Sequence, residues 1–228
     1  MGGEVDSGSS LNVEQVFDSY AERYDRWYEK PFGTSAFNLE KACIESVCQG
    51  LEQPFLEIGV GTGRFAEALK IEYGIDISAG VLRFAKERGI MVVRGKGENL
   101  PFRNNSFGAV FIIVTICFVD NPLKVLEEAR RVLKDNGSMV LGLILEESPW
   151  ASFYKKKGEM GNVFYKVAKF YSFKELKAII EEAKLKIESI SSTIFQAPTE
   201  DLLHFEPPKV GYYERAGFVA VKLGKIGF

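Results

Sequence analysis

The segment from Phe55 to Phe65 limits what this chain can fold into more than any other part of its sequence. It reads Phe-Leu-Glu-Ile-Gly-Val-Gly-Thr-Gly-Arg-Phe, so an apolar strand runs directly into three glycines at alternate positions. A helical pattern begins at Arg64, and a second apolar run ends at Asp76. This combination predicts a parallel sheet that holds a nucleotide-sized ligand at its edge.

Apolar and amphipathic stretches alternate along most of the chain. We expect strands at 54–60, 73–77, 90–93, 107–115, 138–145, 185–195 and 217–223, and helices at 12–30, 36–49, 64–70, 79–88, 122–134 and 172–184. The alternation predicts an α/β fold, with a doubly wound, mostly parallel seven-stranded sheet and helices on both faces. The last two strands are joined without a helix, so the final strand is expected to be antiparallel, in a terminal hairpin.

One domain over 12–228 accommodates all of these elements. The segment 1–11 is rich in Gly and Ser and is predicted to be a disordered tail. The segment 146–171 is aromatic, basic and irregular, which suggests a lid. If the strand at 185–195 is parallel to the others, the loop 196–216 ends on the ligand side and is a second lid segment.

Composition excludes several classes of function. A formal net charge of −2 gives no reason to expect a nucleic-acid partner. No apolar run is long enough for a membrane span. The three cysteines form no CxxC pair, which favours a reducing compartment and a cytoplasmic location. With His204 as the one histidine, the usual zinc sites are excluded and no metal is expected.

Each glycine of the turn has its own predicted role. Gly59 allows a sharp turn out of the strand, and Gly61 lets a ligand reach bare backbone. Gly63 lets the following helix begin close to the sheet, with its free N–H groups facing an anionic group. Asp76 ends the next strand, where a carboxylate can accept hydrogen bonds from both hydroxyls of a ribose.

The glycine pattern admits a second interpretation. The stretch that begins at Gly61 also fits the dinucleotide pattern GxGxxA, which would make the chain an NAD-dependent oxidoreductase. Counted from Gly59, however, the third dinucleotide glycine position holds Arg64, whose side chain would obstruct a pyrophosphate. Motif spacing alone leaves both interpretations open.

Two later motifs add to the glycine turn and Asp76. They are Gly97-Glu-Asn-Leu-Pro-Phe102 and Ala129-Arg-Arg-Val-Leu-Lys-Asp-Asn-Gly137. The ordered set resembles the class I S-adenosylmethionine-dependent methyltransferases, and within them the small-molecule branch similar to the ubiquinone/menaquinone-biosynthesis type. The resemblance implies a Rossmann-like methyltransferase fold, S-adenosylmethionine as cofactor and S-adenosylhomocysteine as product. It also implies methyl transfer to a small-molecule N, O or C acceptor.

The resemblance assigns roles to individual residues. The implied cofactor-binding residues are Tyr24, Glu57, Gly59, Gly61, Gly63, Asp76, Ile77, Gly97, Glu98 and Thr115. Glu57 and the glycine turn would hold the methionine part, and Asp76 would bind the ribose. Ile77 and the loop at 96–98 would meet the adenine, while Thr115 and Ile116 would border the sulfonium. The N-terminal helical segment 12–50 would cover the cofactor.

Two departures from the family pattern stand out. Lys96 lies where the family often has an acidic residue, and lysine cannot accept a hydrogen bond. Adenine must then be held by backbone, by Glu98 or by another residue. Gly108 lies where the family usually has Asp after the Phe at Phe107.

The acceptor is narrowed by motifs that are absent. Thr115-Ile-Cys117-Phe follows the central strand, in place of the Asn/Asp-Pro-Pro-aromatic sequence of enzymes that methylate adenine or glutamine nitrogens. Cys117 does not follow a proline, unlike the nucleophile of cytosine-C5 enzymes, so it is expected to line a pocket. A small-molecule acceptor is favoured by elimination.

Catalytic groups are less well defined. His204 is a candidate general base or substrate contact, and the alternative is a surface histidine in a polar loop. The aromatic residues of 146–171 either enclose an apolar or cationic substrate or pack the lid. A non-catalytic protein that binds S-adenosylmethionine is the remaining alternative.

Overall fold

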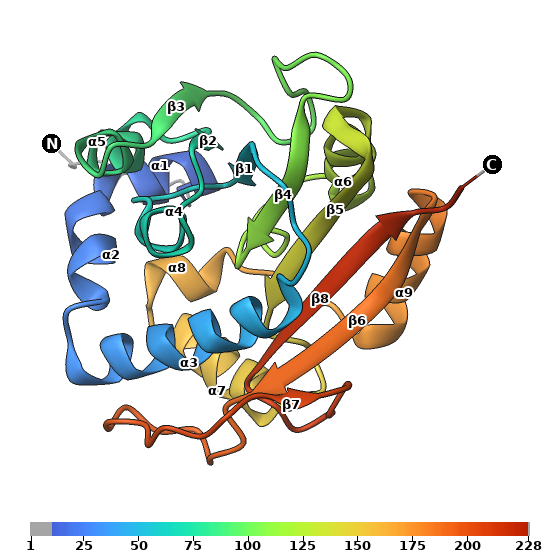
Figure 1. The fold of residues 1–228 in the computed structure, drawn as a ribbon. Coiled ribbons are helices and arrows are strands. Elements are labelled where there is room, and N and C mark those ends of the chain that lie inside the picture. Colours follow the sequence, from blue (N-terminus) through green and yellow to red (C-terminus); the bar gives the residue numbers. More distant parts are fainter. Residues whose placement is uncertain (1–10, 228) are drawn as a thin grey trace, which may run out of the picture.

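The computed structural model describes residues 11–227 (Figure 1). The strands are β1 (Phe55–Ile58), β2 (Tyr73–Asp76), β3 (Met91–Arg94), β4 (Phe107–Ile113), β5 (Leu133–Leu143), β6 (Leu185–Thr193), β7 (Lys209–Val210) and β8 (Phe218–Lys225). They form one sheet in the order β3-β2-β1-β4-β5-β8-β6-β7. The first five strands are parallel, and β8 is antiparallel to both β5 and β6. The predicted α/β fold is therefore confirmed.

The sheet has eight strands where the sequence predicts seven. The additional strand, β7, has two residues and pairs with the end of β6. Because β8 runs antiparallel to both of its neighbours, β6 is parallel to β1–β5, which meets the condition set for the loop 196–216. The loop 196–216 therefore begins at the same edge of the sheet as the glycine turn.

The helices are α1 (Val13–Ser19), α2 (Ala21–Trp27), α3 (Pro31–Val47), α4 (Arg64–Leu69), α5 (Ala79–Glu87), α6 (Pro122–Val132), α7 (Pro149–Glu159), α8 (Val163–Lys166) and α9 (Phe173–Glu182). The predicted helix 12–30 is two helices that meet at Tyr20. Pro31, which lies between the predicted helices 12–30 and 36–49, is the first residue of α3, since proline fits the first turn. The segment 146–171, which we expected to be irregular, contains α7 and α8.

Side chains of the central strands alternate between two apolar layers. Val110 and Ile112 of β4 pack toward α6 and α9, whereas Phe111 and Ile113 pack toward α3, α4 and α5. Figure 1 shows α6 and α9 along one face of the sheet and α3 across the other. All seven residues of β4 are buried, as expected for the central strand of a sheet covered on both faces.

Gly108 has a structural explanation. A Cβ atom at this position would overlap the backbone carbonyl of Glu52, and the Gly108 N–H is donated to the carbonyl of Pro54 at 2.9 Å. The start of β4 therefore passes too close to the segment before β1 for any side chain, including the aspartate that the family pattern suggests.

Three further expectations concern the N-terminal tail, membrane spans and the cysteines. The predicted tail 1–11 lies, apart from Leu11, outside the described residues. Between Leu11 and Gly227, no helix is long and apolar enough to cross a membrane. Cys43, Cys48 and Cys117 are free thiols in the structure.

Candidate functional site

A cavity of about 380 Å³ lies at the carboxyl ends of β1, β2 and β4. Its volume is in the range of small-molecule binding pockets. The lining includes Gly59 and Gly61 after β1, Asp76 at the end of β2, and Thr115 after β4. The N-terminal helical segment borders the cavity through residues 12–14, 17 and 24. We call this space the large cavity and the helix pair α1–α2 the cover.

The glycine turn has left-handed backbone conformations at Gly59 (φ +72°) and Gly61 (φ +53°). A Cβ atom at Gly59 would overlap the side chain of Thr115, so the fold itself excludes a larger residue there. At Gly61 the nearest atom would be Cε1 of Tyr24 at 3.6 Å, an ordinary contact. Gly61 faces the large cavity, where a side chain would occupy space open to a ligand.

Asp76 is bound to the turn at the end of the neighbouring strand. Its Oδ2 accepts a hydrogen bond from the N–H of Gly61 at 3.0 Å, and Oδ1 accepts one from the N–H of Ser78 at 2.9 Å. Burial raises the pKa of Asp76 above its usual value, although these two N–H groups oppose the shift. A carboxylate has about four acceptor sites. Two remain for ligand hydroxyls, and Asp76 and Ile77 both line the large cavity.

Glu57 is buried without a complete set of partners. It is 2% exposed, and its Oε2 has no hydrogen-bond partner among the described residues. Burial, together with the nearby charge of Asp76, raises the pKa of Glu57 well above its usual range. Glu57 does not itself line the large cavity; it lies on β1 two residues before Gly59. An unpaired buried carboxyl at this position fits a ligand with a positively charged group.

The loop expected to meet adenine forms part of the wall of the large cavity through residues 95–98. Glu98 is engaged elsewhere, because its Oε1 accepts hydrogen bonds from the N–H groups of Asp120 (3.2 Å) and Asn121 (3.3 Å) at the start of α6. Lys96 extends to within 3.6 Å of the Asp120 carboxylate at the surface. A flat ring bound at this wall would contact the backbone of this loop and the side chain of Ile77.

Backbone strain occurs where β4 leaves the sheet. Val114 has φ +48°, a region that β-branched residues rarely adopt. The hydroxyl of Thr115 donates to the carbonyl of Ile113 at 2.9 Å, and a longer contact of 3.3 Å reaches the carbonyl of Gly59. Such strain clusters at functional sites. The conformation of Val114 directs Thr115 toward the glycine turn and into the lining of the large cavity.

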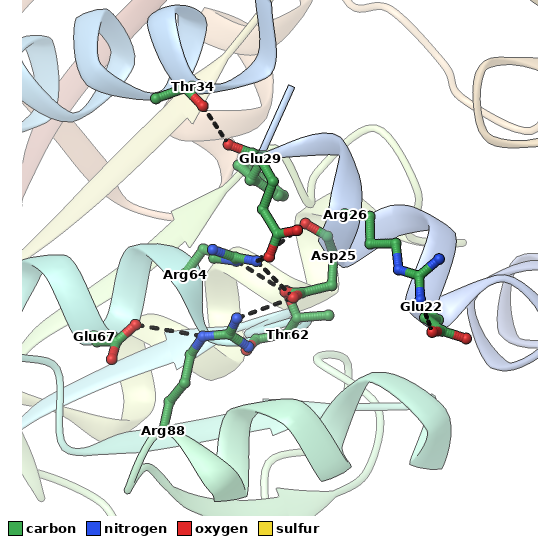
Figure 2. Close-up of polar contacts among 10 residues, drawn as sticks. Glu22, Asp25, Arg26, Glu29, Thr34, Thr62, Arg64, Glu67 and Arg88 are labelled. Carbon is green, nitrogen blue, oxygen red and sulfur yellow. Dashed lines mark hydrogen bonds and ion pairs between the residues drawn. The ribbon is translucent and has the colours of Figure 1, made fainter. Parts of the chain in front are cut away.

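The cover is attached to the glycine turn by a polar cluster that the sequence did not predict (Figure 2). Asp25 of α2 accepts hydrogen bonds from Arg64 (2.9 and 2.6 Å) and from Arg88 (3.0 Å). Arg88 also donates to the carbonyl of Thr62 inside the turn, at 2.8 Å. Burial alone would raise the pKa of Asp25, but the hydrogen bonds from Arg64 and Arg88 hold it below its usual value.

A second polar contact attaches α1. Asp18 accepts hydrogen bonds from the hydroxyl of Ser78 at 2.6 Å and from the N–H of Gly80 at 2.8 Å. Ser78 is the N-cap of α5 and lies two residues after Asp76. Both helices of the cover are thus bonded to the two segments that form the floor of the large cavity.

We expect Asp25→Asn to lower the free energy of unfolding by about 2 kcal/mol, because two partly buried arginines lose their charged, buried partner. Amide hydrogen exchange in residues 13–27 should also become faster. Since the folded-state pKa of Asp25 is lowered, its contribution is present above the unfolded value and is lost as pH falls through the folded one. The variant should therefore show a weaker acid dependence of its melting temperature.

Glu22→Gln provides the matched control, since Glu22 forms an exposed ion pair with Arg26 on the same helix (Figure 2). Exposed pairs of this kind contribute little to stability. If both variants melt and exchange alike, Asp25 does not hold the cover in place.

The structure brings most of the predicted site residues together. Those that line the large cavity are Tyr24, Gly59, Gly61, Asp76, Ile77, Gly97, Glu98 and Thr115. Glu57 and Gly63 lie behind this lining, and Ile116 lines a second, smaller cavity. His204 is exposed, lines neither cavity and contributes only backbone hydrogen bonds to Gln196. The described residues contain no group of three metal-ligating side chains.

Sequence reasoning did not assign Phe17 or Phe118 to the site. Phe17 of α1 lines the large cavity, with Phe118 and Phe164 at ring distances of 5.2 and 5.4 Å. Phe164 also contacts Tyr24 at 5.6 Å. The helical spacing of Val13, Val16 and Phe17 shows an apolar face, but it does not indicate that this face covers a ligand pocket.

Comparisons with known proteins identify the same segment. The family described as a methyltransferase domain matches residues 56–141, from β1 to β5. A solved structure from Thermotoga maritima is 36% identical, covers 93% of this chain and 99% of its own, and superposes with a TM-score of 0.84. That protein is described as an S-adenosylmethionine-dependent methyltransferase and a possible histamine N-methyltransferase.

Two further relatives span different shares of the chain. An uncharacterized protein of Methanocaldococcus jannaschii is 39% identical over 212 residues, which is 92% of this chain and 99% of the relative. A demethylmenaquinone methyltransferase of Thermotoga maritima is 30% identical over 151 residues, 62% of this chain and 63% of its own length.

Proposed function

Because the chain belongs to the class I S-adenosylmethionine-dependent methyltransferases, we propose that it transfers a methyl group from S-adenosylmethionine to a nitrogen, oxygen or carbon atom of a small molecule. The observation that supports this most is the large cavity, which joins the glycine turn and Asp76 at one edge of the sheet. The NAD-dependent oxidoreductase that one phase of the glycine pattern allows does not fit this family.

The residues present fit the cofactor. Gly61 offers an open cradle that a Cβ would fill, Asp76 retains acceptor sites for the ribose hydroxyls, and the unpaired carboxyl of Glu57 suits the ammonium of the methionine part. The residues that would hold it are Tyr24, Glu57, Gly59, Gly61, Gly63, Asp76, Ile77, Gly97, Glu98 and Thr115. Glu98 would contribute through its backbone, because its carboxylate caps α6.

The sulfonium of the bound cofactor supplies both the methyl group and its own leaving group. The chain then needs to orient the acceptor and exclude water. Phe17 and Tyr24 close the large cavity from the cover, and Phe164 of α8 packs on both rings. We assign no catalytic role to His204, because its side chain reaches neither cavity.

The family relatives support a small acceptor. One is named a demethylmenaquinone methyltransferase and another is described as a possible histamine N-methyltransferase, and both names refer to small molecules. In our proposal residues 12–228 form one domain, 12–50 covers the cofactor, and 146–171 with 196–216 encloses the acceptor. Three free thiols favour a reducing compartment such as the cytoplasm.

A labelling experiment tests this function. The protein is incubated with S-adenosylmethionine that carries an isotopically labelled methyl group, together with separated protein, nucleic-acid and small-metabolite fractions. We expect label in the small-metabolite fraction only. Label in protein or nucleic acid would contradict a small-molecule acceptor, and cofactor binding without transfer to any fraction would indicate a non-catalytic binding protein.

A further inference from the structure

The loop 95–104 follows β3 and contributes residues 95–98 to the wall of the large cavity. Its charged side chains are engaged elsewhere, because Lys96 extends toward Asp120 and Glu98 accepts hydrogen bonds at the start of α6. Within the described chain, the N–H groups of Gly97 and Glu98 donate to no backbone acceptor, so they are available to the ring nitrogens of a base. Recognition through main-chain groups requires that the loop itself be held in place.

Two side chains of α6 hold this loop on the side away from the cavity. Glu128 and Arg131 lie one helical turn apart, and the guanidinium of Arg131 donates to both carboxylate oxygens of Glu128 at 2.8 Å. The same guanidinium donates to the carbonyl of Leu100 at 2.9 Å, and to the carbonyl of Phe102 and Oδ1 of Asn104 at 2.8 Å. Glu128 in turn accepts the N–H of Leu100 at 2.8 Å. All five N–H donors of Arg131 are therefore used.

This pair is shielded from solvent and charged. Glu128 is 8% exposed, and the side chain of Arg131 is 31% exposed. The hydrogen bonds from Arg131 are the main reason why the pKa of Glu128 lies below its usual value, so both groups are ionised at pH 7. Charge-assisted hydrogen bonds from a planar guanidinium are stronger and more directional than those between neutral groups. The pair therefore fixes the path of the segment 100–104.

The part of the loop that faces the cavity is closely packed as well. A Cβ atom at Gly97 would lie 2.8 Å from the side chain of Ile58 on β1 and 3.3 Å from that of Val125 on α6. Leu100, three residues later, is 4% exposed and belongs to the apolar core. Because so few bonds separate the two residues, a displacement of the Leu100 peptide also moves the N–H groups that face the cavity.

We propose that Glu128 and Arg131 are positioning residues for the base of the cofactor. By holding the segment 100–104, they set the position of the main-chain groups at 97–98. This inference rests on the proposed function, since it requires the base of S-adenosylmethionine to lie against this wall. Neither side chain lines the large cavity, so neither touches the cofactor. Loss of the pair should weaken contacts with the base and leave contacts with the ribose and the methionine part intact.

The test compares S-adenosylhomocysteine with S-ribosylhomocysteine, which has the same ribose and homocysteine parts but no base. Arg131→Lys keeps the charge but loses the planar fork, so one ammonium group cannot replace the hydrogen bonds to both the loop and Glu128. In this variant we expect calorimetric titration to show about tenfold weaker binding of S-adenosylhomocysteine. Binding of S-ribosylhomocysteine, measured by competition, should stay within about twofold of wild type. Glu128→Gln should give a smaller loss in the same direction, because it keeps one acceptor oxygen for the N–H of Leu100.

Glu127→Gln is the matched control, since Glu127 lies on the same helix, is exposed and pairs with Lys124; it should change the affinity for neither ligand. Amide hydrogen exchange of the free Arg131→Lys protein should become faster at 95–104 and stay unchanged at 13–27. Equal losses of affinity for the two ligands, or no loss for either, would overturn the positioning role alone. A folded wild-type protein that binds neither ligand would contradict the methyltransferase function, and with it this role.

Discussion

Asp76→Ala is expected to weaken S-adenosylhomocysteine binding by at least tenfold, equivalent to about 1.4 kcal/mol. The substitution removes a charged acceptor for the two ribose hydroxyls. It also leaves the N–H groups of Gly61 and Ser78 without their acceptor, so the glycine turn loses its bond to the end of β2. Calorimetric titration gives the affinity, and thermal denaturation shows how much of the loss comes from the fold.

Two control variants separate charge from structure in this test. Asp76→Asn keeps one acceptor oxygen and the shape of the side chain, so its loss of affinity should be smaller than that of alanine. Asp135→Ala removes an aspartate whose side chain is 89% exposed and distant in sequence, and should leave affinity unchanged. Unchanged affinity in Asp76→Ala would remove Asp76 from the binding site.

Gly61→Ala is expected to reduce S-adenosylhomocysteine affinity by more than tenfold while lowering stability only modestly. Alanine in this left-handed conformation costs about 1 kcal/mol, and its methyl group makes no overlap within the protein. The methyl group would instead occupy the large cavity beside Tyr24. The combined result should be a folded protein that no longer accommodates the ligand.

Gly89→Ala is the matched control for backbone strain. Gly89 has φ +82°, no atom lies within 4 Å of a Cβ built there, and the residue is not part of either cavity. The two alanine variants should therefore lose similar stability, but only Gly61→Ala should lose affinity. An equal, small effect on affinity would mean that no ligand approaches the backbone at Gly61.

The features predicted correctly from sequence are those that short patterns encode. The glycine turn, Asp76 and the buried run of β4 are local, and alternating strands and helices leave few topologies open. The segment 146–171 was misjudged because Pro149 and Gly158 break the apolar pattern, yet Pro149 is the first residue of α7 and Gly158 lies within that helix. The strand β7 has too few residues to show any period.

The cover illustrates what short patterns do not encode. Asp25 and Arg64 are 39 residues apart, and nothing in either local sequence indicates that they pair. Arg64 was considered only as an obstacle to a pyrophosphate, whereas its side chain turns away to Asp25 and Glu29. The burial of Glu40 in α3 was likewise not predicted, because one charged residue in an apolar helical pattern does not reveal whether it is buried.

Calorimetric titration of the wild-type protein with S-adenosylhomocysteine, and in parallel with NAD, tests the proposed cofactor most directly. We predict saturable binding of S-adenosylhomocysteine at one site per chain and no binding of NAD. Absence of S-adenosylhomocysteine binding by a folded sample, or binding of NAD in its place, would contradict the assignment of the large cavity to S-adenosylmethionine.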